Sequence, residues 1–322
     1  MKPDDVLSKP LRGIIPPLVT PLTGPDTLDV DGLERLIEHL VAGGVSGLFI
    51  LGSTGEAPHL SYRLRRELIE RTCHQAALRV PVLVGVTDTS LVEAALLARH
   101  AAASGAHAVV SASAYYLPLG QAELFDYCHA LATRSPLPLF LYNMPALTKV
   151  RFELDTVRRL MDVPNILGIK DSSADMIHYH QLLTLGRQRP DWTILMGPEE
   201  LMAESVLLGG HGGVSGGANL APRLYVDLYE AAAGADVEKV RRLHAQVLSL
   251  GRIYRVAGGG SPYLRGLKCA LELSRICAGA LTEPFQPLAG PERERVRQIV
   301  EELANSQVAV HAKPRTTAAP AL

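Results

Sequence analysis

Strand-like apolar runs alternate with amphipathic helical runs along this chain, and this alternation limits the possible folds more than any other feature. Such alternation is typical of a parallel sheet covered by helices. The expected strands are residues 14–20, 47–51, 82–86, 108–111, 137–142, 166–170, 193–196 and 213–215. The expected helices are residues 31–42, 61–77, 90–103, 121–133, 152–161, 176–185, 199–208 and 222–232. Eight strand–helix units predict an α/β fold of the (β/α)8 TIM-barrel type.

A doubly wound open sheet is the alternative architecture, but no Gly-x-Gly-x-x-Gly motif follows the first expected strand. The predicted catalytic barrel spans residues 11–234. Further helical runs at 236–257, 263–273 and 291–305 are expected to form a C-terminal helical appendage, residues 235–305, packed on the barrel. Residues 306–322 show no periodicity and are predicted to be a disordered tail.

Charge and cysteine content argue against several classes of protein. The net charge is -1 with acidic and basic residues intermixed, so neither nucleic acid nor an anionic membrane is an expected partner. The chain begins without the apolar core of a signal peptide and contains no run of 18 apolar residues, so a cytoplasmic protein is expected. The four cysteines are widely spaced, which predicts buried, reduced thiols.

The strand expected at residues 166–170 ends on Lys170. Its apolar residues are interrupted only by a glycine, which predicts a strand buried on both faces. Because removal of an ammonium from water is costly, burial favours the neutral amine, which is a nucleophile toward carbonyls. The alternative is a side chain that reaches solvent from the strand end. Of the seven lysines, only Lys170 is expected in a buried strand, so it is the one candidate for an amine nucleophile.

Polar residues also follow other expected strands, and in barrels of this kind the chemistry lies at the carboxyl ends of the strands. Residues 52–56 carry hydroxyls and backbone N–H groups between glycines, and such donors are suited to binding a carboxylate. Two acidic residues at 199 and 200 are explained by the first turn of a helix, with a secondary role in holding substrate hydroxyls. The stretches at the strand ends are Gly52-Ser53-Thr54-Gly55-Glu56, Tyr115-Tyr116, Tyr142-Asn143-Met144-Pro145, Lys170-Asp171-Ser172-Ser173 and Gly197-Pro198-Glu199-Glu200.

Four motifs, taken together in their order and spacing along the chain, resemble those of the dihydrodipicolinate synthase / N-acetylneuraminate lyase family of class I aldolases. The resemblance covers about residues 11–300. It implies a barrel with C-terminal helices, usually a homotetramer, whose lysine forms a Schiff base with pyruvate or another 2-oxo acid. It implies no metal and no organic cofactor. The four motifs are Gly52-Ser53-Thr54-Gly55-Glu56, Tyr115-Tyr116, Tyr142-Asn143-Met144-Pro145 and Gly168-Ile169-Lys170-Asp171.

Carried onto the matching positions, the resemblance implies that Lys170 is the Schiff-base lysine and Tyr142 the proton-shuttling tyrosine. Ser53 and Thr54 match the pair that holds the 2-oxo acid carboxylate and joins the proton relay. Tyr116 matches a tyrosine that reaches the site of a neighbouring subunit. The other expected substrate-binding positions are Gly52, Ser172, Gly197, Glu199 and Val214.

Leu147 departs from the pattern of the lysine-pathway synthases, because it stands at the arginine position of their motif Tyr-Asn-x-Pro-x-Arg-Thr-Gly. In those enzymes the arginine grips the second carboxylate of the aldehyde substrate, a bidentate contact that a leucine cannot make. Ser53, Glu199 and the sequence after Lys170 are more similar to lyases of sialic acid and of 2-keto-3-deoxy sugar acids. The leading hypothesis is therefore a lyase that reversibly cleaves such a 2-oxo acid to pyruvate and an aldehyde.

Two alternatives stay open. Lys149 or Arg151 in place of the missing arginine would make the chain a 4-hydroxy-tetrahydrodipicolinate (dihydrodipicolinate) synthase, which condenses pyruvate with aspartate semialdehyde. A barrel that binds a 2-oxo acid as a sensor, without turnover, is the other alternative.

Overall fold

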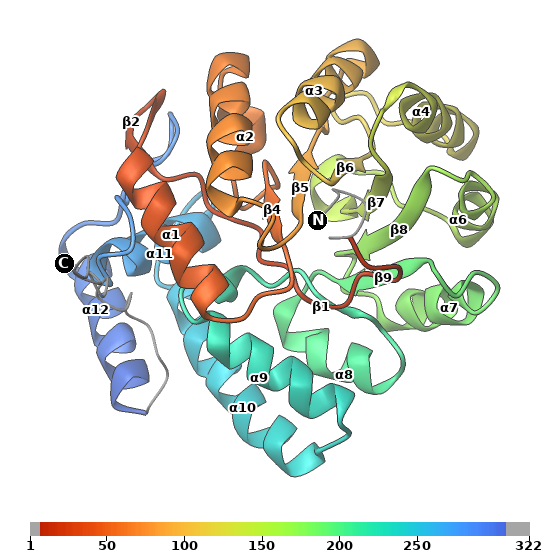
Figure 1. Cartoon of the computed structure of the whole chain (residues 1–322). Helices are drawn as coiled ribbons and strands as arrows, with labels where there is room; N and C mark the ends of the chain where they lie inside the picture. Colours follow the sequence, from red (N-terminus) through yellow and green to blue (C-terminus); the bar gives the residue numbers. More distant parts are fainter. Residues whose placement is uncertain (1–6, 307–322) are drawn as a thin grey trace, which may run out of the picture.

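The computed structural model describes residues 7–306, in which eight parallel strands form one sheet that curls into a barrel (Figure 1). The strand order is β1-β10-β9-β8-β7-β6-β5-β4. A bridge between Pro17 and Phe49 joins the two ends of the sheet, with the Leu18 N–H donating to the Phe49 carbonyl at 2.8 Å. The TIM barrel is confirmed. Its strands are β1 (Gly13–Ile14), β4 (Leu48–Ile50), β5 (Val82–Gly85), β6 (Ala108–Ala112), β7 (Leu139–Asn143), β8 (Ile166–Asp171), β9 (Thr193–Met196) and β10 (Gly212–Gly213).

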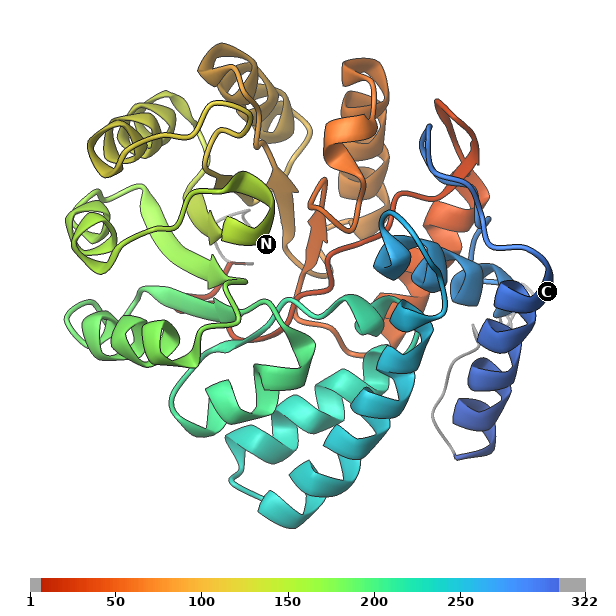
Figure 2. The ribbon, with the colours of Figure 1, turned by 180° about the vertical axis from the view of Figure 1, so that it is seen from behind.

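Helices surround the barrel, as both ribbon views show (Figures 1 and 2). Side-chain caps begin several of them, where Asp29 accepts the N–H of Gly32 and Ser61 that of Leu64. Each cap satisfies a backbone donor that the first helical turn leaves free. The surrounding helices are α1 (Val30–Ala42), α2 (Tyr62–Ala76), α3 (Leu91–Ala103), α4 (Gln121–Arg134), α6 (Leu154–Met161), α7 (Met176–Gly186), α8 (Met202–Leu207) and α9 (Pro222–Ala233).

Three C-terminal helices follow, α10 (Val237–Leu250), α11 (Pro262–Leu273) and α12 (Gly290–Asn305), with α12 at the edge of the molecule in both views. The helix predicted at 236–257 is α-helical only to Leu250 and continues as the 3₁₀ turn η5 (Gly251–Arg255). No helix within residues 7–306 is long and apolar enough to cross a membrane. The predicted tail, residues 306–322, lies outside the described part of the chain apart from Ser306.

Short elements account for the differences from the predicted pattern. The first strand, expected at residues 14–20, pairs regularly only over Gly13–Ile14, because Pro16 and Pro17 have no N–H to donate to a ladder. A hairpin of β2 (Leu22–Gly24) and β3 (Thr27–Leu28) then precedes α1. The other short pieces are α5 (Pro145–Thr148) and the 3₁₀ turns η2 (Ala57–His59), η3 (Glu199–Leu201) and η4 (Gly216–Asn219).

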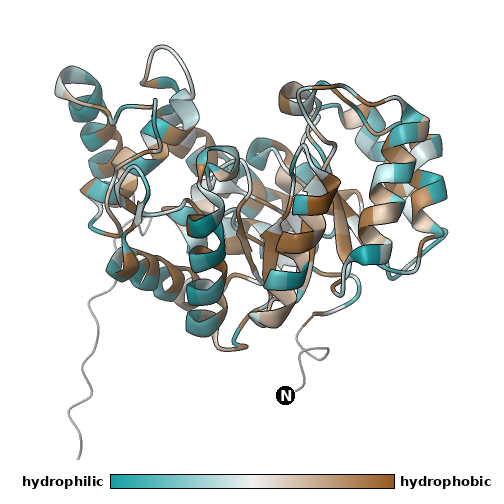
Figure 3. Cartoon of the chain, turned by 90° about the horizontal axis from the view of Figure 1, so that it is seen from above, coloured by the Kyte–Doolittle hydropathy of each residue, from teal (hydrophilic) through white to brown (hydrophobic). Residues whose placement is uncertain are grey.

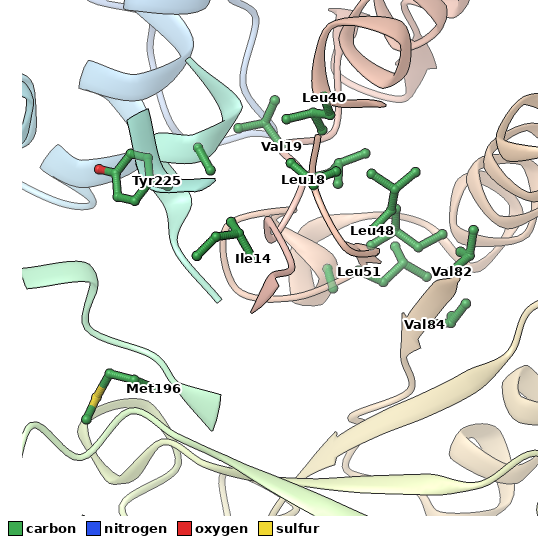
Figure 4. Packing of buried hydrophobic residues seen from close by; sticks show 14 of the residues in the cluster. Ile14, Leu18, Val19, Leu40, Leu48, Leu51, Val82, Val84, Met196 and Tyr225 are labelled. Carbon is green, nitrogen blue, oxygen red and sulfur yellow. The ribbon is translucent and has the colours of Figure 1, made fainter. Parts of the chain in front are cut away.

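Alternate strand residues pack into two apolar cores, because successive side chains of a strand point to opposite faces. The outer core lies between the strands and the helices, and Figure 4 shows part of it around Leu48, Val82 and Val84. In the hydropathy colouring of Figure 3 the central strands are mostly brown. The inner core fills the barrel and includes Leu11, Phe49, Leu83, Phe140, Tyr142 and Leu195.

Candidate active site

A cavity of about 630 Å³ lies at the carboxyl ends of the strands, where the chemistry was expected. The residues that line it come from the carboxyl ends of the eight strands, from the segments that follow them, and from segments after α10. The structure thus brings together nine of the ten predicted site residues. These nine are Gly52, Ser53, Thr54, Tyr142, Lys170, Ser172, Gly197, Glu199 and Val214.

Lys170 lies near the end of β8, and its side chain points into the cavity. The residue is 6% exposed. Its Nζ is 4.1 Å from the centroid of the Tyr142 ring and 5.2 Å from that of Phe49. Because β7 and β8 pair with Tyr142 opposite Lys170, the sheet register places an amine beside a phenol.

The environment of Tyr142 lowers the pKa of its phenol. Burial alone would raise the pKa of this tyrosine. The charge of Lys170 and hydrogen bonds with Ser53, Ser172 and Lys170 outweigh burial, so the pKa of Tyr142 is lowered. Tyr142 is therefore suited to accept a proton inside the cavity.

The loop after β4 carries two hydroxyls that line the cavity. Ser53 Oγ lies 3.5 Å from the Tyr142 hydroxyl, and Thr54 Oγ1 lies 3.4 Å from the hydroxyl of Tyr263. The loop turns back on itself, with the Gly55 N–H donating to the Gly52 carbonyl at 3.0 Å. The amine, the phenol and these hydroxyls together suit addition of a lysine to a carbonyl whose neighbouring carboxylate is held by the loop.

Glu199 lines the cavity, but the protein itself occupies its carboxylate. Oε1 accepts hydrogen bonds from Tyr225 at 2.7 Å and Tyr254 at 2.8 Å, and Oε2 accepts one from the Gly217 N–H at 2.7 Å. Burial raises the pKa of Glu199, while these three donors oppose the rise. This geometry differs from the expectation that Glu199 grips substrate hydroxyls.

Tyr116 is the one predicted site residue outside the cavity of its own chain. It is 91% exposed and has a φ of +78°, so the loop turns its side chain outward. Its neighbour Tyr115 lines the cavity instead.

Neither basic residue considered as a substitute for the missing arginine lines the cavity. Lys149 Nζ donates to the Ala146 carbonyl at 2.8 Å, and Arg151 pairs with Asp175 at 2.8 Å. Leu147 does line the cavity, so this wall carries an apolar side chain. Among the described residues that line the cavity, Lys170 is the only lysine or arginine.

The sequence did not point to the C-terminal residues of the site. Tyr254, Tyr263 and Phe285 line the cavity, and the rings of the two tyrosines lie 4.6 Å apart. Burial first, and then the charge of Glu199, raises the pKa of both tyrosines, so they are neutral hydroxyls. The run Gly258-Gly259-Gly260-Ser261-Pro262 marks the turn before α11, but nothing in it predicts that the turn returns to the barrel mouth.

A second buried lysine was also missed. Lys268 on α11 is fully buried and forms an ion pair with Glu56, two residues after Thr54. Its Nζ also donates to the Ala280 carbonyl at 2.7 Å. Lys268 therefore joins α11 to the loop that carries the cavity hydroxyls.

Neither a cluster of metal ligands nor a disulfide occurs among residues 7–306. Within residues 7–306, no group of three or more His, Cys, Asp or Glu side chains is placed to hold a metal ion. The four cysteines are buried and free.

Comparison with known proteins gives consistent matches over almost the whole chain. The model of the dihydrodipicolinate synthetase family matches residues 10–303. A 4-hydroxy-tetrahydrodipicolinate synthase of Ralstonia nicotianae is 34% identical over 287 residues, which are 89% of this chain and 96% of the relative. The solved structure of dihydrodipicolinate synthase from Bacteroides thetaiotaomicron superposes with a TM-score of 0.90 at 52% identity, covering 92% of this chain and 99% of the other.

A relative with a different name matches equally well. Escherichia coli YagE, named a putative 2-dehydro-3-deoxy-D-gluconate aldolase, is 33% identical over 294 residues, 90% of this chain and 96% of YagE. Its structure, solved in complex with pyruvate, superposes with a TM-score of 0.86 at 32% identity and covers 91% of this chain and 98% of the other.

Proposed function

The chain belongs to the dihydrodipicolinate synthetase family, and we propose that it is a Schiff-base lyase that reversibly cleaves a 2-oxo acid to pyruvate and an aldehyde. Its relatives are named synthases and aldolases, so the chain is an enzyme of carbon–carbon bond chemistry. The substrate we propose is a 2-keto-3-deoxy sugar acid or a sialic-acid-like 2-oxo acid. The observation that carries the proposal is the buried Lys170 amine beside Tyr142 in one cavity.

In the proposed reaction, Lys170 Nζ adds to the C2 carbonyl of the substrate, and loss of water gives an iminium ion. Tyr142, whose pKa is lowered, takes the proton of the C4 hydroxyl. The C3–C4 bond then breaks, its electrons move into the iminium to give an enamine, and C4 leaves as an aldehyde. Protonation at C3 and hydrolysis release pyruvate and free Lys170. General-base catalysis of this kind contributes about 10²- to 10⁴-fold.

The loop after β4 is proposed to hold the carboxylate of the substrate. Ser53 and Thr54 present hydroxyls to the cavity, and Ser53 lies beside Tyr142, where it can also relay a proton. The side chains of Ser172 and Val214 and the backbone at Gly52 and Gly197 complete the pyruvate end of the cavity. Such fixed geometry lowers the entropic cost of reaching the transition state.

The test is reductive trapping of pyruvate. The protein is incubated with pyruvate and sodium borohydride, and the added mass is located by peptide mass spectrometry. We expect the adduct on the Lys170 peptide and none on the peptide of Lys268, which is also buried but ion-paired with Glu56. Lys170→Ala should abolish both trapping and turnover while the circular dichroism spectrum stays unchanged. A Lys170→Ala variant with near-full activity would end this account.

The synthase is the second candidate, because several relatives carry that name. Leu147 in the cavity wall, with Lys149 and Arg151 engaged elsewhere, weighs against a second substrate carboxylate. A coupled assay separates the two, since the synthase would use aspartate semialdehyde far better than sugar-derived aldehydes. A binding protein without turnover would instead show thermal stabilisation by pyruvate with no product formed.

We also propose that the chain works as a homotetramer in which Tyr116 completes the site of a neighbouring copy. The support is the exposure of Tyr116 and of the adjacent Leu117, which is 72% exposed. Analytical ultracentrifugation measures the assembly state. The proposed location is the cytoplasm, which the free, buried cysteines support.

A further inference from the structure

Behind the pair Tyr142 and Lys170, on the outer face of the barrel, lies a second pair formed by the next residue of each strand. Asn143 follows Tyr142 on β7 and Asp171 follows Lys170 on β8, and the two stand opposite each other in the sheet. Asn143 Nδ2 donates to Asp171 Oδ1 at 2.5 Å. Both residues are buried, at 0% and 1% exposure. The reaction described above uses neither of them.

Every polar atom of this outer pair has a partner. Asn143 Oδ1 accepts the N–H of Phe152 at 3.1 Å, which closes the segment that contains Leu147. Asp171 Oδ2 accepts the hydroxyl of Ser173 at 2.9 Å. A buried polar pair with all partners satisfied fixes one geometry, whereas a pair that lost a partner would leave a costly unpaired group.

We infer that Asn143 and Asp171 are positioning residues whose hydrogen bond sets the distance between Tyr142 and Lys170. The coupling runs through the backbone, because Asn143 adjoins Tyr142 and Asp171 adjoins Lys170, and neighbouring residues of a strand move together. Two backbone hydrogen bonds also hold these residues, from the Ser172 N–H to the Asn143 carbonyl at 2.8 Å and from the Gly197 N–H to the Asp171 carbonyl at 2.7 Å. We call the Asn143–Asp171 side-chain bond and these two backbone bonds the clamp. The inference rests on the proposed Schiff-base function.

Charge is not what the clamp requires. Burial raises the pKa of Asp171, and hydrogen bonds from Asn143 and Ser173 and the nearby His178 of α7 oppose that rise. Tyr179 is the other titratable group of α7 that faces this carboxyl. If the hydrogen bond is the essential feature, the amide and the carboxylate can exchange places without loss.

The first variant is Asn143→Asp, which places two carboxylates in contact. At neutral pH such a pair repels unless it shares a proton. We expect kcat to fall by about 10- to 100-fold at pH 8, because misplacement of reacting groups is costly, with a smaller loss at pH 6 where a shared proton restores the bond. Pyruvate should still be trapped on Lys170.

The matched control is the exchange variant Asn143→Asp/Asp171→Asn. Here the residue at 143 still accepts from Phe152, and the amide at 171 donates to it and accepts from Ser173. We expect kcat to return to within about threefold of the parent, with the parent pH profile, since near-attack geometry is restored. An exchange variant no more active than Asn143→Asp, or an Asn143→Asp variant with the parent kcat and pH profile, would overturn the inference.

Asp171→Ala covers the case in which Asn143→Asp does not fold. Turnover is then expressed per site that borohydride and pyruvate can trap, which corrects for any unfolded fraction. The inference predicts a lower turnover per trapped site and a shifted pH optimum, and parent values for both would refute it. If the parent enzyme itself traps no pyruvate, the proposed function fails, and that result differs from any of these.

Discussion

Replacement of Lys268 by methionine tests whether its ion pair with Glu56, in the loop after β4, stabilises the fold. Both partners are buried, with Lys268 at 0% and Glu56 at 1% exposure. Methionine fills a similar volume, so the change removes the charge without opening a large cavity. The carboxylate of Glu56 then stays buried with two donors, the N–H and the hydroxyl of Thr282 at 2.9 and 2.8 Å.

The size of the effect follows from that arrangement. Breaking a buried ion pair costs about 3–5 kcal/mol because a charge is left uncompensated. The two donors from Thr282 put the expected loss in the free energy of unfolding near the lower end, about 3 kcal/mol. Urea unfolding followed by the fluorescence of Trp192, the only tryptophan of the chain and 1% exposed, measures it.

The double variant Glu56→Gln/Lys268→Met is the control, because it leaves no buried charge. We expect it to recover at least about 1 kcal/mol relative to Lys268→Met. A Lys268→Met variant that unfolds at the parent urea concentration, or a double variant no more stable than the single one, would contradict a stabilising role of the ion pair.

Two further predictions concern proton transfer by Tyr142 in the reaction and the effect of His211 protonation on stability. Tyr142→Phe should lower kcat by about 10²- to 10⁴-fold while borohydride still traps pyruvate on Lys170, and unchanged turnover would remove Tyr142 from its role. His211 has its pKa lowered to about 4, by burial first and then by Arg12, and its Nδ1 accepts the Ile194 N–H at 2.9 Å. Since the unfolded chain binds this proton near pH 6.5, stability should fall between pH 6.5 and 4 by roughly 2–3 kcal/mol. His211→Asn, which keeps an acceptor, should flatten that part of a plot of melting temperature against pH, and an unchanged slope would contradict the assignment.

The strands and most of the site could be predicted because both depend on local rules. A strand buried on two faces is an apolar run in the sequence, as at residues 166–169 of β8. The rule that chemistry lies at the carboxyl ends of the strands then groups Lys170, Tyr142 and Ser53 without any knowledge of distances. The first strand was predicted too long, because the prolines at 16 and 17 continue the apolar pattern but have no N–H to donate to a neighbouring strand.

Glu199 and Tyr116 show where local rules end. The resemblance to sugar-acid lyases suggested that Glu199 faces the substrate, but three donors from Gly217, Tyr225 and Tyr254 surround it, two of them tyrosines outside the predicted strand ends. Tyr116 lies one residue from Tyr115, and the positive φ at Tyr116 sends the two side chains in different directions. Neither packing partners nor a single backbone angle can be read from residue types.

The C-terminal helices contribute to the site more directly than an appendage would. Tyr254 donates a hydrogen bond to Glu199 and packs against Tyr263. The hydroxyl of Tyr263 in turn lies 3.4 Å from Thr54 Oγ1. Lys268, five residues further along α11, holds Glu56 at the other end of the same short loop. The loop that presents Ser53 and Thr54 is therefore held at two points by one helix. Because that helix lies beyond residue 234, the barrel and the C-terminal helices line one cavity, and a shift of α11 would move the loop with Ser53 and Thr54 without touching Lys170.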